Sequence, residues 1–353
     1  MKKSPQPLRG RGALSNPDNR FNHYQSEAID DGWGSLDEER PAPKTELIKD
    51  TAKSIISYNQ SPDVPFDRSI NPYRGCEHGC VYCYARPSHA YLGYSPGLDF
   101  ETKLSYKANA AALLRAELAK KNYQCQPIAL GINTDAYQPI EAKLGITREI
   151  LSVLAQHQHP VSIVTKSSMI ERDLDLLMPL AEKNLLHVAV SITSLDRKLS
   201  RHLEPRAAAP QRRLKTIETL AEAGIAVSVI VAPLIPMLTD HELEKILSAA
   251  RQAGAQDAMY ILLRLPLEIS DLFEQWLLQH APLKAERVMN RIRDSRGGKT
   301  YDANFAHRMT GTGIFSQLIK QRFKLAYAKQ GFEALPDLDC SQFVVPGTQQ
   351  CLF

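Results

Sequence analysis

The chain has 353 residues, of which 43% are hydrophobic and 23% are charged, and its formal net charge is +4. A chain of this length can bury one large core or two modest ones. Its apolar stretches are too short to cross a bilayer, which excludes a membrane-spanning protein and predicts a soluble one without a membrane partner.

Residues 1–44 are rich in Gly, Pro, Asn and charged residues and show no helical or strand periodicity. This composition predicts a mobile N-terminal arm, with Phe21, Tyr24 and Trp33 as candidate anchors to the body. The opening Lys-rich and Pro-rich residues do not resemble the apolar segment of a signal peptide, so we expect a reducing, cytoplasmic location.

Three cysteines lie within eight residues, Cys76, Cys80 and Cys83, with the spacing C-x3-C-x2-C. Three thiolates leave a tetrahedral metal site one ligand short, and an open coordination position is where metal chemistry takes place. The motif therefore predicts a metal centre with one free position.

The alternative is a structural zinc site with His78 or His89 as fourth ligand. Zinc loops usually pair two C-x2-C units, and the chain has no second pair of this kind, which argues against zinc. The reducing location also argues against a disulfide. Cys125, Cys340 and Cys351 lie apart from the trio and receive no role.

Short strand-like runs alternate with helix-like segments over most of the chain. The strand-like runs are β-branched or Leu-rich, as is typical of parallel strands buried on both faces. Six strands are predicted, at 66–71, 127–132, 161–165, 187–192, 226–232 and 258–263. Helices are predicted between them at 106–121, 147–156, 173–182, 210–223 and 240–253. This order indicates a parallel α/β fold, either a partial barrel or an open doubly wound sheet.

Polar residues follow several of these strands, where the loops of a parallel α/β fold converge. The candidates are Asn133, Thr134, Asp135, Lys166, Ser191 and Thr193. Hydroxyls, amides and a cation suit a zwitterionic nucleoside ligand. The hydroxyls are alternatively helix caps, since Ser and Thr commonly begin the helix that follows a strand.

The strings CVYCY, INTDAYQPIE, TKS and SITSLD resemble the radical S-adenosylmethionine (SAM) superfamily and, within it, the spore photoproduct lyase-like branch. The resemblance extends over about residues 69–265. It implies a partial (β/α)6 TIM-like barrel and a 4Fe-4S cluster held by the three cysteines, with SAM on the fourth iron. Reductive cleavage of SAM would then give a 5'-deoxyadenosyl radical that abstracts hydrogen from a substrate.

The resemblance also implies roles for single residues. Thr134 and Ser191 would contact the amino acid part or the ribose of SAM, and Lys166 its carboxylate. Tyr82 would lie near the adenine through its backbone, and Tyr84 would lie near the radical and relay hydrogen. Asn133, Asp135 and Thr193 complete the candidate set for SAM.

Two further positions bear on the substrate. Arg206, in the string LEPRAAAP, would reach the SAM carboxylate or a substrate phosphate, or is an ordinary surface arginine near the start of a helix. The lyase carries a cysteine hydrogen donor where Ile132 stands here, so repair of thymine dimers by the same relay is not expected. The strings RGRGALSNP and HRMTGTGIF resemble other bacterial lyase-like proteins, for which the resemblance implies no particular substrate.

The positive charge is concentrated in residues 284–330, which contain eleven Lys and Arg residues against three acidic ones. Together with interleaved Phe and Tyr residues, this composition is typical of a nucleic-acid groove, with Arg291, Arg293, Lys299 and Arg308 as contacts to phosphates. The alternative is a helix predicted at 314–329 whose charged face is solvated. Its Phe and Tyr rings would then belong to the core, because they form one stripe along the helix. A second helix is predicted at 270–279.

The last five residues, Gln349 to Phe353, resemble the short peptide by which bacterial repair and replication proteins bind the sliding clamp. This peptide would anchor the protein to the clamp, and the alternative is a tail that packs on its own domain. The predicted parts are thus the arm (1–44), the barrel (45–266), a helical, basic C-terminal extension (267–335) and an extended tail (336–353).

The predicted function is that of a radical SAM enzyme acting on a nucleic-acid base or sugar, in DNA repair or nucleic-acid modification, supplied by an electron donor such as flavodoxin or ferredoxin. The alternatives are a peptide or small-molecule substrate, and a non-catalytic iron-sulfur module that binds nucleic acid.

Overall fold

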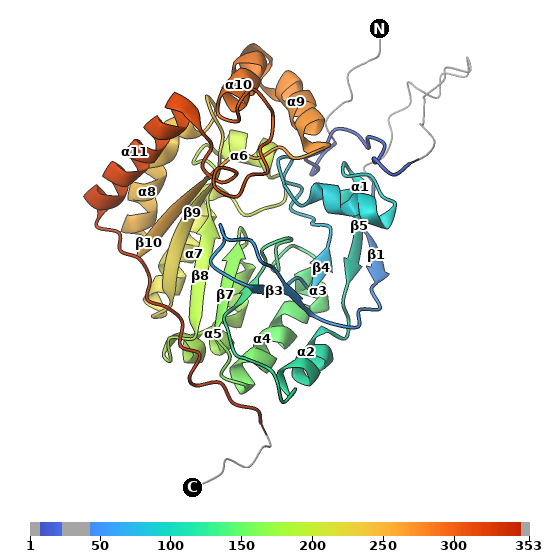
Figure 1. The fold of residues 1–353 in the computed structure, drawn as a ribbon, viewed down its shortest axis with the longest axis vertical. Coiled ribbons are helices and arrows are strands. Elements are labelled where there is room, and N and C mark those ends of the chain that lie inside the picture. The colour runs from blue at the N-terminus through green and yellow to red at the C-terminus, as the bar shows by residue number, and fades with distance from the viewer. Residues whose placement is uncertain (1–7, 23–42, 347–353) are drawn as a thin grey trace.

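The computed structural model describes residues 8–22 and 43–346, and its centre is a seven-stranded sheet (Figure 1). Its strands in spatial order are β2 (Ile56–Tyr58), β3 (Arg68–Ile70), β6 (Ile128–Leu130), β7 (Val161–Thr165), β8 (Leu186–Ser191), β9 (Ala226–Leu234) and β10 (Asp257–Leu262). All are parallel except β2, which is antiparallel to β3. The six predicted strands are therefore confirmed.

The order of the strands separates the two predicted architectures. From β3 to β10 each strand pairs with the next strand of this sheet in the chain, so the winding never reverses. A doubly wound sheet has a point at which the strand order reverses, whereas a (β/α) barrel is wound in one direction. The fold is thus of the TIM-like partial-barrel type.

Helices cover the outer side of this sheet (Figure 1). The predicted ones are found as α2 (Ala110–Leu118), α4 (Ile146–Gln156), α5 (Leu174–Ala181), α7 (Pro210–Glu222) and α8 (Leu243–Gln252). Local sequence explains their limits: α7 has Pro at its first position, and Gly224 with φ +76° follows its end. Shorter helices that were not predicted are α3 (Glu141–Leu144), η2 (Ser168–Asp173) and α6 (Arg197–Leu203), and the predicted helix at 240–253 begins with the short η3 (Asp240–Glu242).

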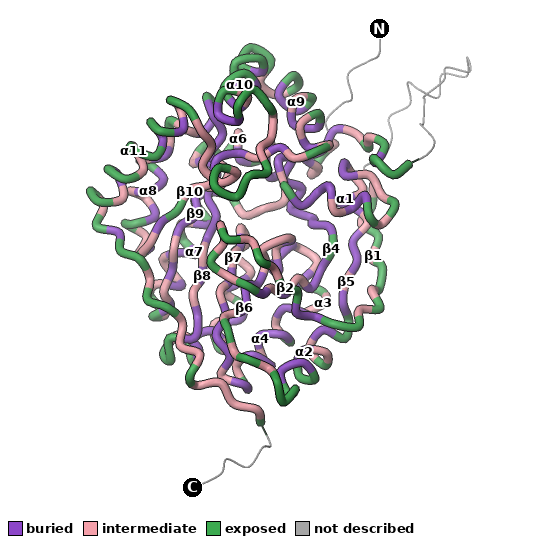
Figure 2. The backbone as a smooth tube through the Cα atoms, in the orientation of Figure 1, coloured by how far each residue is buried: buried purple, intermediate pink, exposed green. Residues whose placement is uncertain are grey.

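The main core lies between the sheet and these helices (Figure 2). All three residues of β6 are fully buried, as expected for a strand covered on both faces. In α8 the buried residues are Leu243, Ile246, Leu247 and Ala250, which is the spacing of one helix face.

A second sheet of three short strands lies beside the barrel and was not predicted (Figure 1). It consists of β1 (Glu46–Lys49), β5 (Lys103–Tyr106) and β4 (Tyr73–Arg74). The predicted helix at 106–121 is wrong at its start, because Tyr106 ends β5 and the helix begins at Ala110. The helices η1 (Arg86–Leu92) and α1 (Asp99–Thr102) lie in the chain between β4 and β5.

Residues 8–22, the described part of the predicted arm, pack against the body. Ala13 and Leu14 are buried, and the backbone amides of Gly12 and Ala13 donate to the carboxylate of Glu101 at 3.0 and 2.8 Å. The ring of Phe21 lies 5.2 Å from that of Tyr91. The other two predicted anchors, Tyr24 and Trp33, lie outside the described residues.

Three helices form most of the C-terminal extension: α9 (Ile269–His280), α10 (Pro282–Asp294) and α11 (Gly313–Gln330). The first two contribute Phe273, Trp276 and Met289 to a second core, which also contains Val81 and Tyr82 of the cysteine loop. The helix α11 packs on α8. In the described residues no helix is both long and apolar enough to span a membrane.

The tail runs back along the body toward the opposite end of the molecule (Figure 1). The amides of Asp339 and Val344 donate to the carbonyls of Asn184 and His157, at 3.0 and 2.9 Å. The clamp-like peptide, Gln349 to Phe353, lies outside the described residues and stays a prediction.

Candidate active site

The three cysteines lie in the loop between β4 and η1, and the neighbouring chain fixes this loop on both sides. The amide of Cys76 donates to the carbonyl of Phe100 at 2.9 Å, and that of Val81 to the carbonyl of Leu203 at 3.1 Å. Gly79 has φ +67°, and a Cβ added to Gly12 would lie 1.8 Å from the Gly79 carbonyl oxygen. Both positions therefore require glycine.

Arg86 holds the same loop from inside the protein. Its guanidinium donates to the carbonyls of Cys80, Gly79, Pro96 and Gly97 at 2.8–3.3 Å. It also forms an ion pair with Glu101 at 2.5 Å, and both side chains are fully buried. This pair was not predicted, because an arginine three residues after the last cysteine carries no signal of burial.

The three thiols are close to one another within this loop. The side chain of Cys83 packs in the same clusters as Cys76 and Cys80. Burial raises the pKa of all three thiols, and the neighbouring Cys80 and Asp135 raise that of Cys76 further. Without a cation the thiols stay protonated at neutral pH, so a metal centre here has to displace their protons.

The donor set fits a cubane iron-sulfur cluster with one iron left free. Among the described residues, no three His, Cys, Asp or Glu side chains are arranged to hold a single metal ion. A cluster does not need such an arrangement, since each cysteine binds a different iron. The two histidines of the zinc alternative have other neighbours: His78 Nδ1 lies 3.4 Å from Asp135, and His89 Nε2 lies 2.9 Å from the Lys103 carbonyl oxygen.

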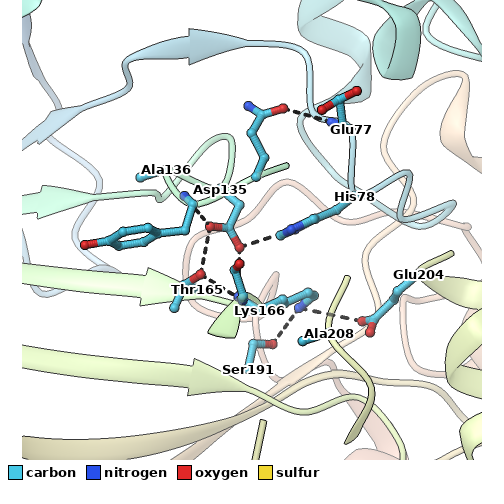
Figure 3. A network of polar contacts seen from close by, with 12 residues as sticks. Glu77, His78, Asp135, Ala136, Thr165, Lys166, Ser191, Glu204 and Ala208 are labelled. Carbon is cyan, nitrogen blue, oxygen red and sulfur yellow. Dashed lines mark hydrogen bonds and ion pairs between the residues drawn. The ribbon is translucent and has the colours of Figure 1, made fainter. Parts of the chain in front are cut away.

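The predicted residues after β6 and β7 form one polar network beside the loop (Figure 3). Asp135 accepts hydrogen bonds from the Thr165 hydroxyl at 2.8 Å and the Lys166 amide at 2.7 Å. Burial opposes ionisation of Asp135, but His78 and the backbone amides of Lys166 and Tyr137 outweigh it and hold its pKa below the usual value. Asp135 is thus a carboxylate that ties together the ends of two strands and the cysteine loop.

Lys166 and Ser191, predicted on different strands, are brought into direct contact (Figure 3). The Lys166 ammonium donates to Ser191 Oγ at 2.6 Å and to the Ala232 carbonyl at 3.3 Å, and it lies 3.8 Å from Glu204. Its side chain is 17% exposed. A cation that is mostly buried but still open to the surface is placed to meet a ligand carboxylate.

Glu204 was not predicted, yet it joins most of this side of the site. Its carboxylate forms a buried ion pair with Arg213 and contacts the hydroxyls of Tyr82 and Thr193. Burial alone would raise its pKa, but Arg213 and Lys166 lower it to about 2. The hydroxyls of Tyr82 and Thr193 are therefore directed to a protein carboxylate.

The other predicted SAM contacts lie nearby with protein partners. The Thr134 hydroxyl donates to the Tyr73 carbonyl at 2.8 Å, and the Asn133 amide donates to Asn71 at 3.0 Å. Arg206 forms an ion pair with Glu77 at 2.7 Å. Glu77 follows Cys76 directly, so Arg206 lies at the cysteine loop.

Tyr84 is held at the end of β6. Its hydroxyl donates to the Ile132 carbonyl, and the Arg264 guanidinium lies 4.5 Å from its ring centroid. Desolvation raises the pKa of Tyr84 to about 12, so the phenol keeps its proton at neutral pH. The residue is 42% exposed, which leaves part of it accessible to a substrate.

The four predicted nucleic-acid contacts are distributed over α10 and the loop after it. Arg291 lies 3.6 Å from Asp294, and Arg293 donates to Asn290 at 3.0 Å. Lys299 is exposed. Arg308 forms a two-pronged ion pair with Asp63. Of the interleaved rings, Phe323 packs on Tyr260 and Tyr327, as the core alternative expects, whereas Phe305 is 45% exposed.

Comparison with known proteins identifies the family. A family model described as the radical SAM superfamily matches residues 70–250, just over half of the chain. An uncharacterized protein of Mycobacterium tuberculosis (strain ATCC 25618 / H37Rv) is 39% identical over 221 residues, which cover 62% of this chain and 65% of that protein. The chain thus matches less than two thirds of this relative. An uncharacterized protein of Methanocaldococcus jannaschii is 29% identical over 70% of this chain and 88% of that one.

Solved structures show the same fold. Spore photoproduct lyase complexed with dinucleoside spore photoproduct has a TM-score of 0.58 and 15% identity, covering 84% of this chain and 86% of that one. A mutant of this lyase with bound AdoMet has a TM-score of 0.53 and 15% identity, covering 84% of this chain and 88% of that one. The predicted family and fold are therefore confirmed. The chain belongs to the radical SAM superfamily, whose members hold a 4Fe-4S cluster and SAM.

Proposed function

We propose that the protein is a radical SAM enzyme that abstracts a hydrogen atom from a nucleic-acid base or sugar. The observation that carries this proposal is the loop of Cys76, Cys80 and Cys83, which offers three sulfur ligands packed in the same clusters. The three cysteines would hold the cluster. With one electron, from a donor such as flavodoxin or ferredoxin, the bound cluster and SAM supply the 5'-deoxyadenosyl radical.

The residues around the loop would bind and orient SAM. Lys166 offers a cation for its carboxylate, and Ser191 and Thr134 lie at strand ends where the amino acid part or the ribose would lie. Arg206 lies at the loop through its ion pair with Glu77. Four further residues would position the chain around SAM, because their polar groups contact the protein itself: Thr193, Asn133, Asp135 and Tyr82. Tyr84 would keep its proton at the exposed side and pass hydrogen to or from the substrate.

Two features support a nucleic-acid substrate. The fold is that of a lyase whose solved structure contains a dinucleoside photoproduct. The described chain also places cations and the exposed ring of Phe305 in the loop that follows α10. Because Ile132 stands where the lyase has its cysteine donor, the hydrogen returned to the product would come from another group.

The test is anaerobic reconstitution with iron and sulfide, followed by reduction with dithionite in the presence of SAM. We expect release of 5'-deoxyadenosine by the wild type, its loss in Cys80→Ala, and its retention in the control Cys340→Ala. Deuterated DNA or RNA oligonucleotides should transfer label into 5'-deoxyadenosine. SAM cleavage without label from any oligonucleotide would refute the substrate class, and no cleavage at all would refute the enzyme.

A further inference from the structure

An arginine without an acceptor lies at the carboxyl end of the sheet. Arg264 follows β10, and its guanidinium stacks over the ring of Tyr84 at 4.5 Å. Among the described residues, no carbonyl or side chain accepts a hydrogen bond from this guanidinium, and no carboxylate lies within ion-pair distance of it. The N–H donors of this guanidinium therefore have no acceptor among the described residues, and they lie beside the ring of Tyr84.

Arg264 is half-buried and keeps its charge. Burial lowers the pKa of Arg264 and the positive charge of Arg308 lowers it further, while Tyr84 and Asp63 raise it, and an arginine stays charged at neutral pH. A half-buried guanidinium without a protein acceptor can donate to an anion that reaches Tyr84.

The frame around Arg264 is rigid. The buried Arg296 donates to the carbonyls of Leu262 and Leu263 on one side, at 3.2 and 2.9 Å, and to those of His307 and Arg308 on the other, both at 2.9 Å. These bonds tie the loop after α10 to the end of β10. Arg264, Arg296 and Arg308 thus lie near one another, and the carboxylate of Asp63 forms its ion pair with Arg308.

The position of Arg264 separates it from the predicted SAM contacts. Lys166 lies 6.0 Å from the ring centroid of Tyr82, next to Ser191 and Ala232, whereas Arg264 lies over Tyr84. The two tyrosines are two residues apart in the loop and have different cations as neighbours. The cation beside Tyr84 is therefore free for a second ligand.

We propose that Arg264 binds a phosphate of the substrate and so places a nucleotide against the exposed side of Tyr84. The planar fork of a guanidinium matches two phosphate oxygens. A guanidinium stacked on an aromatic ring also forms a flat surface on which a base can lie. This inference rests on the proposed function, because it names the group by which the substrate is held at that site.

The test measures binding of fluorescein-labelled hexathymidylate to the reconstituted, SAM-loaded protein by fluorescence anisotropy. Removing a charged donor from phosphate costs about 10-fold to 100-fold in affinity, so Arg264→Gln should weaken binding by that factor. Arg264→Lys should recover part of it. The exposed Lys320 belongs to the same basic region, and Lys320→Gln serves as the matched control with less than about 3-fold change.

A second probe keeps the test valid if Arg264→Gln does not fold. Hexathymidylate with uncharged methylphosphonate linkages should bind the wild type much more weakly than the natural oligomer, and Arg264→Lys should narrow this difference. Equal binding of both oligomers by the wild type, or equal losses in Arg264→Gln and Lys320→Gln, would overturn the inference. Release of 5'-deoxyadenosine by the wild type without oligonucleotide is measured separately, so failure of the proposed function is recognised on its own.

Discussion

Arg308 and Asp63 join the two edges of the seven-stranded sheet. The guanidinium of Arg308 donates to both oxygens of Asp63, with Nη2 2.6 Å from Oδ1. Asp63 lies between β2 and β3, and the residue after Arg308, Met309, accepts a hydrogen bond from Leu262 of β10. Since β2 and β10 are the edge strands, this ion pair bridges the open side of the partial barrel.

The first prediction concerns this bridge. Arg308→Gln should lower the free energy of unfolding by about 1.5–3 kcal/mol, because it removes two charge-assisted hydrogen bonds of a largely buried pair. Urea unfolding of Arg308→Gln, Asp63→Asn and the double variant measures this, and the losses of the two single variants should not add in the double variant. Additive losses would show that the two residues act independently.

The second prediction concerns acid stability. Burial opposes the charge of Glu204, but Arg213 and Lys166 lower its pKa to about 2 in the folded protein, against 4.5 as the ordinary value. A depressed carboxyl pKa stabilises the fold above pH 4.5, and this contribution is lost as the pH falls toward 2. The free energy of unfolding, measured with urea at a series of pH values, should therefore fall over this range.

The matched variant for this experiment is Glu204→Gln. It should flatten the pH dependence between about pH 4.5 and pH 2 and cost about 3–5 kcal/mol at neutral pH, because Arg213 is left buried without a counterion. An unchanged slope in Glu204→Gln would assign the acid sensitivity to other carboxylates.

The third prediction concerns metal content. Cys83→Ala, purified anaerobically, should hold less iron and show weaker brown absorption than the wild type, because one ligand of the cluster is missing. Cys125→Ala is the control, since Cys125 lies outside the loop, and should match the wild type. Wild-type protein with one zinc per chain and no iron would contradict the cluster.

The fourth prediction concerns the support of the cysteine loop. Arg86→Gln should destabilise the protein by about 3–5 kcal/mol and reduce iron incorporation, because the carboxylate of Glu101 is left buried without its counterion. The exposed pair of Arg212 and Glu171 gives the comparison, and Arg212→Gln should cost less than about 1 kcal/mol. Similar losses in the two variants would mean that burial of the Arg86 pair is unimportant.

Much of the barrel could be predicted because its signals are local. The strand at 161–165 is found with the predicted limits, because a short run of β-branched residues predicts a buried strand without information from the rest of the chain. The sheet of β1, β5 and β4 could not be found in this way. Its strands have two to four residues, and Glu46 pairs with Lys103, more than fifty positions away, so no local periodicity marks the pairing.

The same distinction applies to the site. The three cysteines could be predicted because a cluster takes its ligands from one short loop. The partners of Glu204 could not be predicted. They are Arg213, Tyr82 and Lys166, which come from different elements and are brought together only by the fold. Arg264 was missed for a related reason: its position over Tyr84 depends on where β10 ends relative to the loop.

The contact between Gly12 and Gly79 makes a distant part of the chain a wall of the cysteine loop. The protein shell around a metal centre controls solvent access to it, and dissolved oxygen reaches a cluster with the solvent. A truncated protein beginning at β1 would retain every ligand and still lack this wall. Its cluster would decay faster in air, although its ligand residues would all be present.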